Sequence, residues 1–412
     1  MSNSSLIETT ARYTYIENGS VTSVKGIKAS GIYCGLKRKN KDLALIYSDA
    51  PAVSAGTYTT NKAAAPPVII SKNITEKNQK VKAIIVNSGN ANACTGVEGH
   101  LDALEIQNKC AESLDLSNSE ILISSTGVIG ERLNVSAITK SLENLKNDLS
   151  PSGGLNAAEA IMTTDTIPKS FALTVQLSNG EITIGGIAKG SGMIMPNMAT
   201  MLGFVTTDAK INKDLLQSAL TEAVNDSYNK ISVDGETSTN DMVLMLANEL
   251  SNVEIAENSE DYSIFVSALK DLSIKMAKSI VFDGEGATKF ITININNAAS
   301  EEDANLIAKS LANSPLVKTA INGGDPNWGR IISAASSCGA EIIPENTSLY
   351  FNDLPLLQPG YKTDFKEEDA AKILAKKNIV ITLDLNIADS NTTWWTCDYS
   401  EEYIKINAHY RT

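Results

Sequence analysis

Residues 189–202 read KGSGMIMPNMATML, which places two glycines, a proline and a small alanine in front of Thr200. Glycine and proline are ordinary turn formers, so one interpretation is a simple loop that leads into a buried apolar strand. The other interpretation is that Thr200 is a nucleophile and that the loop distorts the peptide bond before it. The composition and the remaining motifs of the chain decide between the two.

The bulk composition is that of a globular protein and excludes several classes. The chain has 412 residues, of which 42% are hydrophobic and 20% are charged, and this length suits two or three domains. A formal net charge of −13 argues against a nucleic-acid partner. Because we find neither a secretory signal nor an apolar run of about 18 residues, we predict a cytoplasmic protein that does not associate with membranes.

Cysteine and histidine usage limits the possible chemistry. The five cysteines are scattered without a CxxC motif, which favours free thiols over a disulfide framework or a zinc site. Only His100 and His409 are available for a catalytic triad or a metal, and we interpret both as surface or structural residues. We interpret the acids of residues 234–241 and 283–285 as solvated turn residues, and we predict no metal site. An enzyme with this sequence therefore needs a general base other than histidine.

Strand and helix patterns alternate along the chain, which predicts an α/β (α+β) fold. Residues 171–190 predict a hairpin that turns at Asn179-Gly180, because apolar residues alternate on both sides of that pair. Apolar residues recur at helical spacing over residues 138–149 and 265–276. From about residue 290 to residue 412 the chain has its own strands and helices, which we interpret as a separate α/β subdomain.

Seven loops rich in glycine, asparagine, serine and threonine each follow an apolar segment. Any one of them is explained as an ordinary turn, but seven in one chain favour a composite functional site. None contains GxxxxGK[ST] or GxGxxG, so neither a P-loop nor a Rossmann fingerprint is supported. The loops are NSGNANACTG (87–96), SSTGVIG (124–130), MTTDTIPK (162–169), KGSGMIMPNMAT (189–200), SVDGETSTND (232–241), FDGEGATKF (282–290) and NGGDPNWGR (322–330).

Thr200 has the surroundings of a self-activating nucleophile. A cut between Ala199 and Thr200 would free an α-amine with a pKa of about 7.7–8.0, which can act as the missing base. Attack of the Thr200 hydroxyl on the Ala199 carbonyl moves the acyl group from nitrogen to oxygen, and water then completes the cut. Thr126 and the backbone N–H of Gly127 are the residue types that stabilise an oxyanion.

These loops, together with ASGIYCGLKRKNKDLALI (29–46) and NAHYRT (407–412), closely resemble the ornithine acetyltransferase family of arginine biosynthesis, the glutamate N-acetyltransferases. The resemblance runs from about residue 25 to the last residue. It implies a layered α/β sandwich of the N-terminal-nucleophile type with a smaller α/β C-terminal domain. It also implies autoproteolysis into an α chain (1–199) and a β chain (200–412), which assemble as an α2β2 heterotetramer.

The resemblance further implies an activity and a set of site residues. Thr200 carries the acetyl group from N2-acetylornithine to glutamate, with Thr126 and Gly127 as the oxyanion hole and without a cofactor. Some members of the family also accept acetyl-CoA, and this sequence leaves that donor open. The implied substrate contacts are Thr163, Lys189, Thr200, Glu285, Asn407 and Thr412.

Two other classes remain as alternatives. A related threonine-nucleophile amidase or aminopeptidase would release the acyl group to water, and comparing free acetate with acetylglutamate separates it from an acetyltransferase. A non-catalytic protein that binds acylated amino acids is the third class, and the intact loop in front of Thr200 argues against it.

The loop chemistry predicts that the purified protein consists of two fragments, residues 1–199 and 200–412. Sequencing of the second fragment should begin with Thr-Met-Leu-Gly-Phe. Thr200→Ala removes the attacking hydroxyl, so this variant should remain one chain and be inactive. An active wild-type enzyme that stays uncut would contradict the prediction.

Overall fold

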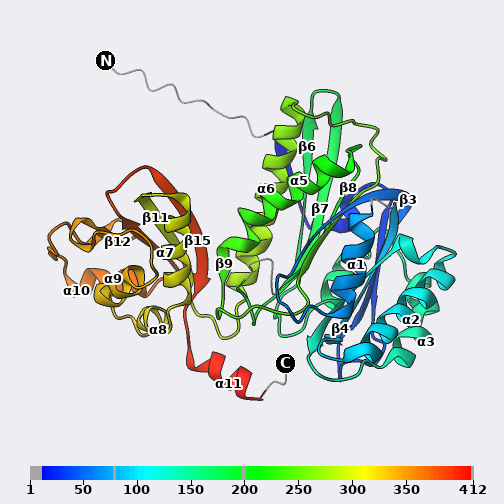
Figure 1. Ribbon diagram of the computed structural model, residues 1–412, viewed down its shortest axis with the longest axis horizontal. Coiled ribbons are helices and arrows are strands. Elements are labelled where there is room, and N and C mark those ends of the chain that lie inside the picture. Colours follow the sequence, from blue (N-terminus) through cyan, green and yellow to red (C-terminus); the bar gives the residue numbers. More distant parts are fainter. Residues whose placement is uncertain (1–11, 78–79, 196–200, 410–412) are drawn as a thin grey trace.

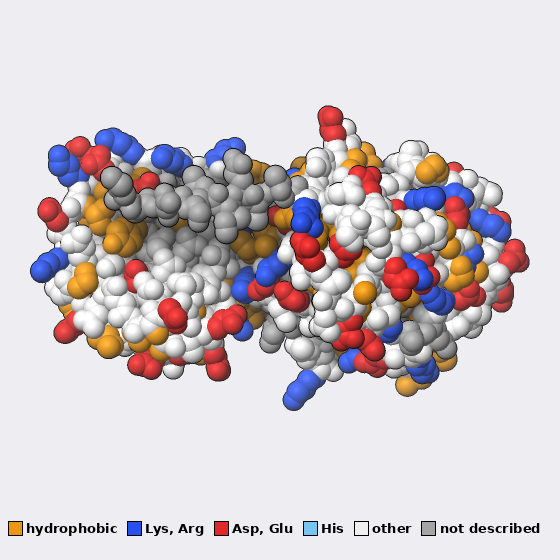
Figure 2. Space-filling model, turned by 90° about the horizontal axis from the view of Figure 1, so that it is seen from above, with side chains coloured by type: hydrophobic (Ala, Val, Ile, Leu, Met, Phe, Trp, Pro, Cys, Tyr) orange, Lys and Arg blue, Asp and Glu red, His pale blue; other side chains and the backbone are white. Residues whose placement is uncertain are grey.

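The computed structural model describes residues 12–77, 80–195 and 201–409, which form two β-sheets covered by helices (Figure 1). The part built on the larger sheet is called the large unit here, and the part built on the smaller sheet the small unit. Seen from above, they form two lobes joined at a waist, with acidic and basic side chains interspersed over both (Figure 2). Within the described residues, no helix has the length and apolar character needed to cross a membrane.

The large sheet has nine strands in the order β1-β6-β7-β8-β10-β3-β4-β5, with β2 paired to β3. The long strand β3 joins its two halves, because residues 53–58 pair with β10 and residues 43–47 pair with β2 and β4. The strands are β1 (Tyr13–Ile16), β2 (Ile27–Ile32), β3 (Leu43–Tyr58), β4 (Val81–Asn90), β5 (Ile121–Val128), β6 (Lys169–Leu177), β7 (Gly180–Lys189), β8 (Leu202–Thr207) and β10 (Met242–Ala247).

Helices cover both faces of this sheet, and the side chains of its central strands alternate between two cores. In β10, Leu244 and Leu246 face one core, whereas Val243 and Met245 face the other. Being buried on both faces explains why β10 reads as a continuous apolar run. The first core packs under α1 (Pro66–Glu76), α2 (Gly96–Leu114), α3 (Val135–Asn147) and α4 (Gly154–Ala160), and the second under α5 (Lys213–Asn225) and α6 (Glu260–Phe282).

The small unit has a six-stranded sheet in the order β13-β12-β14-β11-β15-β9 and a hydrophobic core of its own. Its edge strand β9 comes from residues that precede α6 and pairs with the end of β15, which ties the two units together. The strands are β9 (Ile231–Ser232), β11 (Phe290–Ala298), β12 (Ser348–Phe351), β13 (Leu354–Leu357), β14 (Asn378–Asp384) and β15 (Ser390–Cys397).

Five helices belong to this part of the chain within its described residues. The last of them, α11, leads from the end of β15 back toward the large unit (Figure 1). They are α7 (Glu301–Asn313), α8 (Pro315–Gly323), α9 (Trp328–Ser336), α10 (Glu367–Leu374) and α11 (Glu401–His409). Short 3-10 turns lie at η1 (Val21–Ser23), η2 (Asn118–Glu120), η3 (Tyr228–Lys230) and η4 (Pro344–Asn346).

The predicted layered α/β class with a second, smaller α/β unit is confirmed, and so are the helices seen in the spacing, which are α3 and α6. The hairpin of β6 and β7 is also confirmed, but its turn lies one residue earlier than predicted. Leu177 pairs with Gly180, so Ser178 and Asn179 form the connection. Gly180 supplies the positive φ of 149°, a conformation that glycine adopts without a Cβ penalty.

Candidate active site

A cavity of about 310 Å³ lies where loops of the large unit meet α11. This volume suits a ligand of amino-acid size. The cavity is lined by six of the residues that the sequence analysis singled out, namely Thr126, Gly127, Thr163, Lys189, Glu285 and Asn407. The other three predicted site residues, Ala199, Thr200 and Thr412, lie outside the described residues.

The predicted oxyanion-hole pair sits at the end of β5, beside the end of β4. Gly127 pairs with Gly89 across the two strands. A Cβ on Gly127 would lie 2.3 Å from the backbone carbon of Gly89, and the φ of Gly127 is +131°, so only glycine fits there. The side chain of Thr126 faces the cavity from the neighbouring position.

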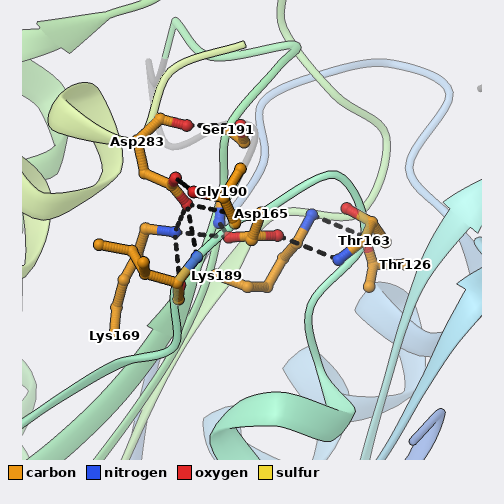
Figure 3. Close-up of polar contacts among 10 residues, drawn as sticks. Thr126, Thr163, Asp165, Lys169, Lys189, Gly190, Ser191 and Asp283 are labelled. Atoms are coloured by element: carbon orange, nitrogen blue, oxygen red, sulfur yellow. Dashed lines mark hydrogen bonds and ion pairs between the residues drawn. The ribbon is translucent and has the colours of Figure 1, made fainter. Parts of the chain in front are cut away.

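Lys189 ends β7 and reaches across to β5. Its Nζ donates to the Thr126 hydroxyl at 3.4 Å, and the two side chains point toward each other in Figure 3. Burial lowers the pKa of Lys189, while the nearby carboxylate of Asp165 opposes that shift. An ammonium group that lines a cavity of this size is suited to pair with the carboxylate of a ligand.

Glu285 provides a negative charge in the same cavity and is only 5% exposed. Its Oε2 accepts from Asn407 Nδ2 at 2.8 Å, and its backbone N–H donates to Ser191 O at 3.0 Å. A Cβ on Gly192 would lie 2.3 Å from the Glu285 carboxyl carbon, so the glycine leaves room for this side chain. Asn407 comes from α11, which thereby completes the cavity from the far end of the chain.

The structure adds cavity residues that sequence reasoning did not assign. Asp234 accepts from the backbone of Met193 and Ile194 at 2.6 and 2.8 Å, and Tyr403 donates to it at 3.3 Å. Glu236, Ser238 and Asn240 also line the cavity. The signal that could have identified these residues is the SVDGETSTND motif. Its polar residues directly follow one short strand, β9.

The interpretation of the acids of residues 234–241 and 283–285 as solvated turn residues is wrong for three of them. Asp241, Asp283 and Glu285 are 2%, 7% and 5% exposed, because their loops fold inward between strand ends. Within the described residues, no group of three or more histidine, cysteine or acidic side chains could hold a metal ion. The five cysteines are free.

Asp241 is the most unusual of the buried acids. Its Oδ2 has no hydrogen-bond partner within the described residues. Burial raises the pKa of Asp241 well above its usual value, although the Lys189 cation acts in the opposite direction. Such a group is most stable in its neutral form inside the protein.

A larger hollow of about 820 Å³ lies among α7, α8 and α9. Lys309 and Arg330 are its charged residues, and no carboxylate lines it. The smaller cavity is the better candidate for acyl transfer, because it alone of the two is lined by the predicted oxyanion-hole pair and by charges of both signs.

Comparisons with known proteins identify the family of the chain. Residues 28–412 match the model of the ArgJ family. The arginine biosynthesis bifunctional protein ArgJ of Chlorobaculum tepidum is 46% identical over 94% of this chain and 96% of its own length. The protein of the same name from Dehalococcoides mccartyi is 47% identical over 96% of this chain and 98% of its own length.

A crystal structure of arginine biosynthesis bifunctional protein argJ from Bacillus halodurans is 40% identical to part of this chain. The match covers 50% of this chain and 98% of that one, with a TM-score of 0.49. The match to the family model and the two near-full-length relatives place the protein among α/β enzymes of acyl transfer. The chain belongs to the ArgJ family.

Replacement of Asp241 tests its protonation state. A raised pKa means that the group stabilises the fold below its unfolded pKa and that this stabilisation is lost as the pH rises through the raised value. Asp241→Asn keeps the neutral form at every pH. The melting temperature of the variant minus that of the wild type should therefore increase from pH 5 to pH 8. A difference in melting temperature that is the same at both pH values would contradict a neutral Asp241.

Proposed function

We propose that this protein transfers the acetyl group of N2-acetylornithine to glutamate through an acetyl ester on Thr200, in arginine biosynthesis. The observation that carries the proposal is the cavity in which Lys189, Glu285, Thr126 and Gly127 meet. The names of the full-length relatives support the pathway. Hydrolysis of the ester by water, as in a related amidase or aminopeptidase, is the alternative.

In the first half-reaction Lys189 pairs with the α-carboxylate of acetylornithine, and Glu285 pairs with its side-chain ammonium. The Thr200 hydroxyl attacks the acetyl carbonyl, and the α-amine of Thr200 takes the hydroxyl proton. Thr126 and the Gly127 N–H donate to the oxyanion. The C–N bond then breaks, and the proton passes from the Thr200 amine to the amine of the departing ornithine.

In the second half-reaction glutamate occupies the same cavity, because it shares the α-amino-acid end of ornithine. Its amine attacks the acetyl ester, the Thr200 oxygen leaves and recovers a proton, and N-acetylglutamate is released. Thr163 and Asn407 line this space and are proposed to contact the substrates, together with Thr412. Exclusion of water from the cavity by the bound substrate would keep the ester from hydrolysis.

Several finer features belong to the same proposal. We propose cleavage into residues 1–199 and 200–412, an α2β2 assembly of these chains, and a C-terminal subdomain from about residue 290. We also propose a cytoplasmic enzyme that needs no cofactor. Relatives named bifunctional support acetyl-CoA as a second acetyl donor.

Because one nucleophile serves both substrates in turn, the kinetics should be ping-pong. Double-reciprocal plots with glutamate varied at several acetylornithine concentrations should give parallel lines. Acetylornithine alone should leave one acetyl group on the fragment that begins at Thr200, seen by mass spectrometry after acid quenching. Intersecting lines without an acetylated fragment would indicate direct transfer instead, and release of acetate in place of acetylglutamate would favour the hydrolase.

Glu285→Gln tests the donor end of the cavity. The variant keeps the size of the side chain but removes the charge that faces the ornithine ammonium. The kcat/KM for acetylornithine should fall by the equivalent of about 1.5–3 kcal/mol, the range for a hydrogen bond to a charged group. Glu254→Gln removes a surface carboxylate paired with Lys210 and should leave kcat/KM unchanged. Equal kcat/KM values in both variants would show that Glu285 does not bind the donor.

A further inference from the structure

A fully buried lysine joins two carboxylates directly behind the cavity. Lys169 Nζ lies 2.7 Å from Asp165 Oδ1 and 2.6 Å from Asp283 Oδ2, and its side chain is 0% exposed. Figure 3 shows the lysine between the two acids, on the side of Asp165 away from Thr126. None of the three residues lines the cavity, and the proposed reaction does not use them.

A buried cluster of three charges is not expected to increase the stability of the fold by itself. Each ion taken out of water costs several kcal/mol, and a buried pair often stabilises a fold no better than well-packed apolar residues. The hydrogen bonds of the two carboxylates show which segments of the chain the three charges hold in place.

Asp165 connects two segments that carry predicted substrate contacts. Its Oδ2 accepts from the backbone N–H of Thr163 at 3.0 Å. Its Oδ1, which also binds Lys169, accepts from the backbone N–H of Gly190 at 2.7 Å. Thr163 and Gly190, the residue that follows Lys189, are thus tied to one carboxylate, although they lie on different segments of the chain.

Asp283 connects the same loop to Glu285. Its Oδ2 accepts from the backbone N–H of Thr166 at 3.0 Å, and its other oxygen accepts from the Thr166 hydroxyl. Its backbone carbonyl accepts from Ser191 Oγ at 2.6 Å, and Ser191 O in turn accepts from the Glu285 N–H. Asp283 therefore ties the loop of residues 162–168 to the segment that carries Glu285.

We propose that Lys169 is a positioning residue that sets the spacing of Thr163, Lys189 and Glu285 by holding Asp165 and Asp283 together. The proposal rests on the proposed function, which makes those three residues the substrate contacts. Without the Lys169 cation, the buried carboxylates of Asp165 and Asp283 would face each other with no positive charge between them. They would repel, and the loop of residues 162–168 would shift relative to the ends of β7 and α6.

The surrounding charges define the expected response to pH. Burial raises the pKa of Asp165, but the Lys169 and Lys189 cations outweigh it and bring the value to about 2. Lys37 also faces Asp165, from the loop before β3. Once Lys169 is replaced, the pKa of Asp165 should rise, because its closest cation is gone and the carboxylate of Asp283 remains near it.

Lys169→Met tests the proposal, because methionine keeps much of the length and removes the charge. A displacement of about 1 Å in the contacts can cost about 100-fold in rate, so kcat/KM for acetylornithine should fall on that order. The ratio of variant to wild-type kcat/KM should increase as the pH is lowered, since protonation of one carboxylate relieves the repulsion. The added substitution Asp283→Asn, which neutralises one acid, should restore part of the activity.

Lys230→Met is a matched control, because Lys230 pairs with Asp226 at the same i,i+4 spacing and neither residue lines the cavity. It should leave kcat/KM unchanged. Cleavage at Thr200 and the melting temperature are recorded for every variant, and the double variant serves if Lys169→Met does not fold. A loss of activity that is constant with pH and not restored by Asp283→Asn would overturn the positioning role, as would full activity of Lys169→Met.

Binding of ornithine, measured by calorimetry, separates this proposal from the proposed function. Ornithine shares both charged ends with the donor but has no acetyl group to transfer. The positioning role requires weaker ornithine binding in Lys169→Met and partial recovery in the double variant. Unchanged ornithine binding would contradict it. A wild-type enzyme that binds ornithine but transfers no acetyl group would contradict the proposed function alone.

Discussion

The pairing of β7 with β8 in the middle of the large sheet is the constraint on which the site depends. Lys189 and Leu202 are the last register partners of that pair, so the chain must leave and re-enter the sheet at adjacent strands within residues 190–201. The two residues that flank this segment, Lys189 and Leu202, are therefore both anchored in central strands. One anchor residue, Lys189, is itself a cavity residue.

The same sheet would keep the two proposed fragments together after cleavage. Strands β8 and β10 follow Thr200, and they pair with β7 on one side and with β3 on the other, both of which precede it. Separation would break hydrogen bonds along two strand pairs and expose both hydrophobic cores to water. The proposed cleavage before Thr200 would therefore leave both strand pairs intact.

Much of the candidate site can be predicted from motifs of the sequence. Thr126, Gly127, Thr163, Lys189, Glu285 and Asn407 are scattered over most of the chain, yet all of them line one cavity. Local patterns also identified α3, α6 and the β6–β7 hairpin, because these depend on spacing within one segment. The turn of the hairpin was misplaced by one residue, because the Asn-Gly signal does not specify strand register.

The sequence by itself determined the class of the protein and the residues of its loops, because local periodicity and family motifs are properties of neighbouring residues. Tertiary structure decided which polar residues are buried and what they hold. Asp283 reads as a turn acid, and it becomes a partner of Lys169 only because β6 and the end of α6 are brought together across 114 positions of the chain. No local pattern records that contact, because the burial and charge of a side chain are set by segments distant in sequence.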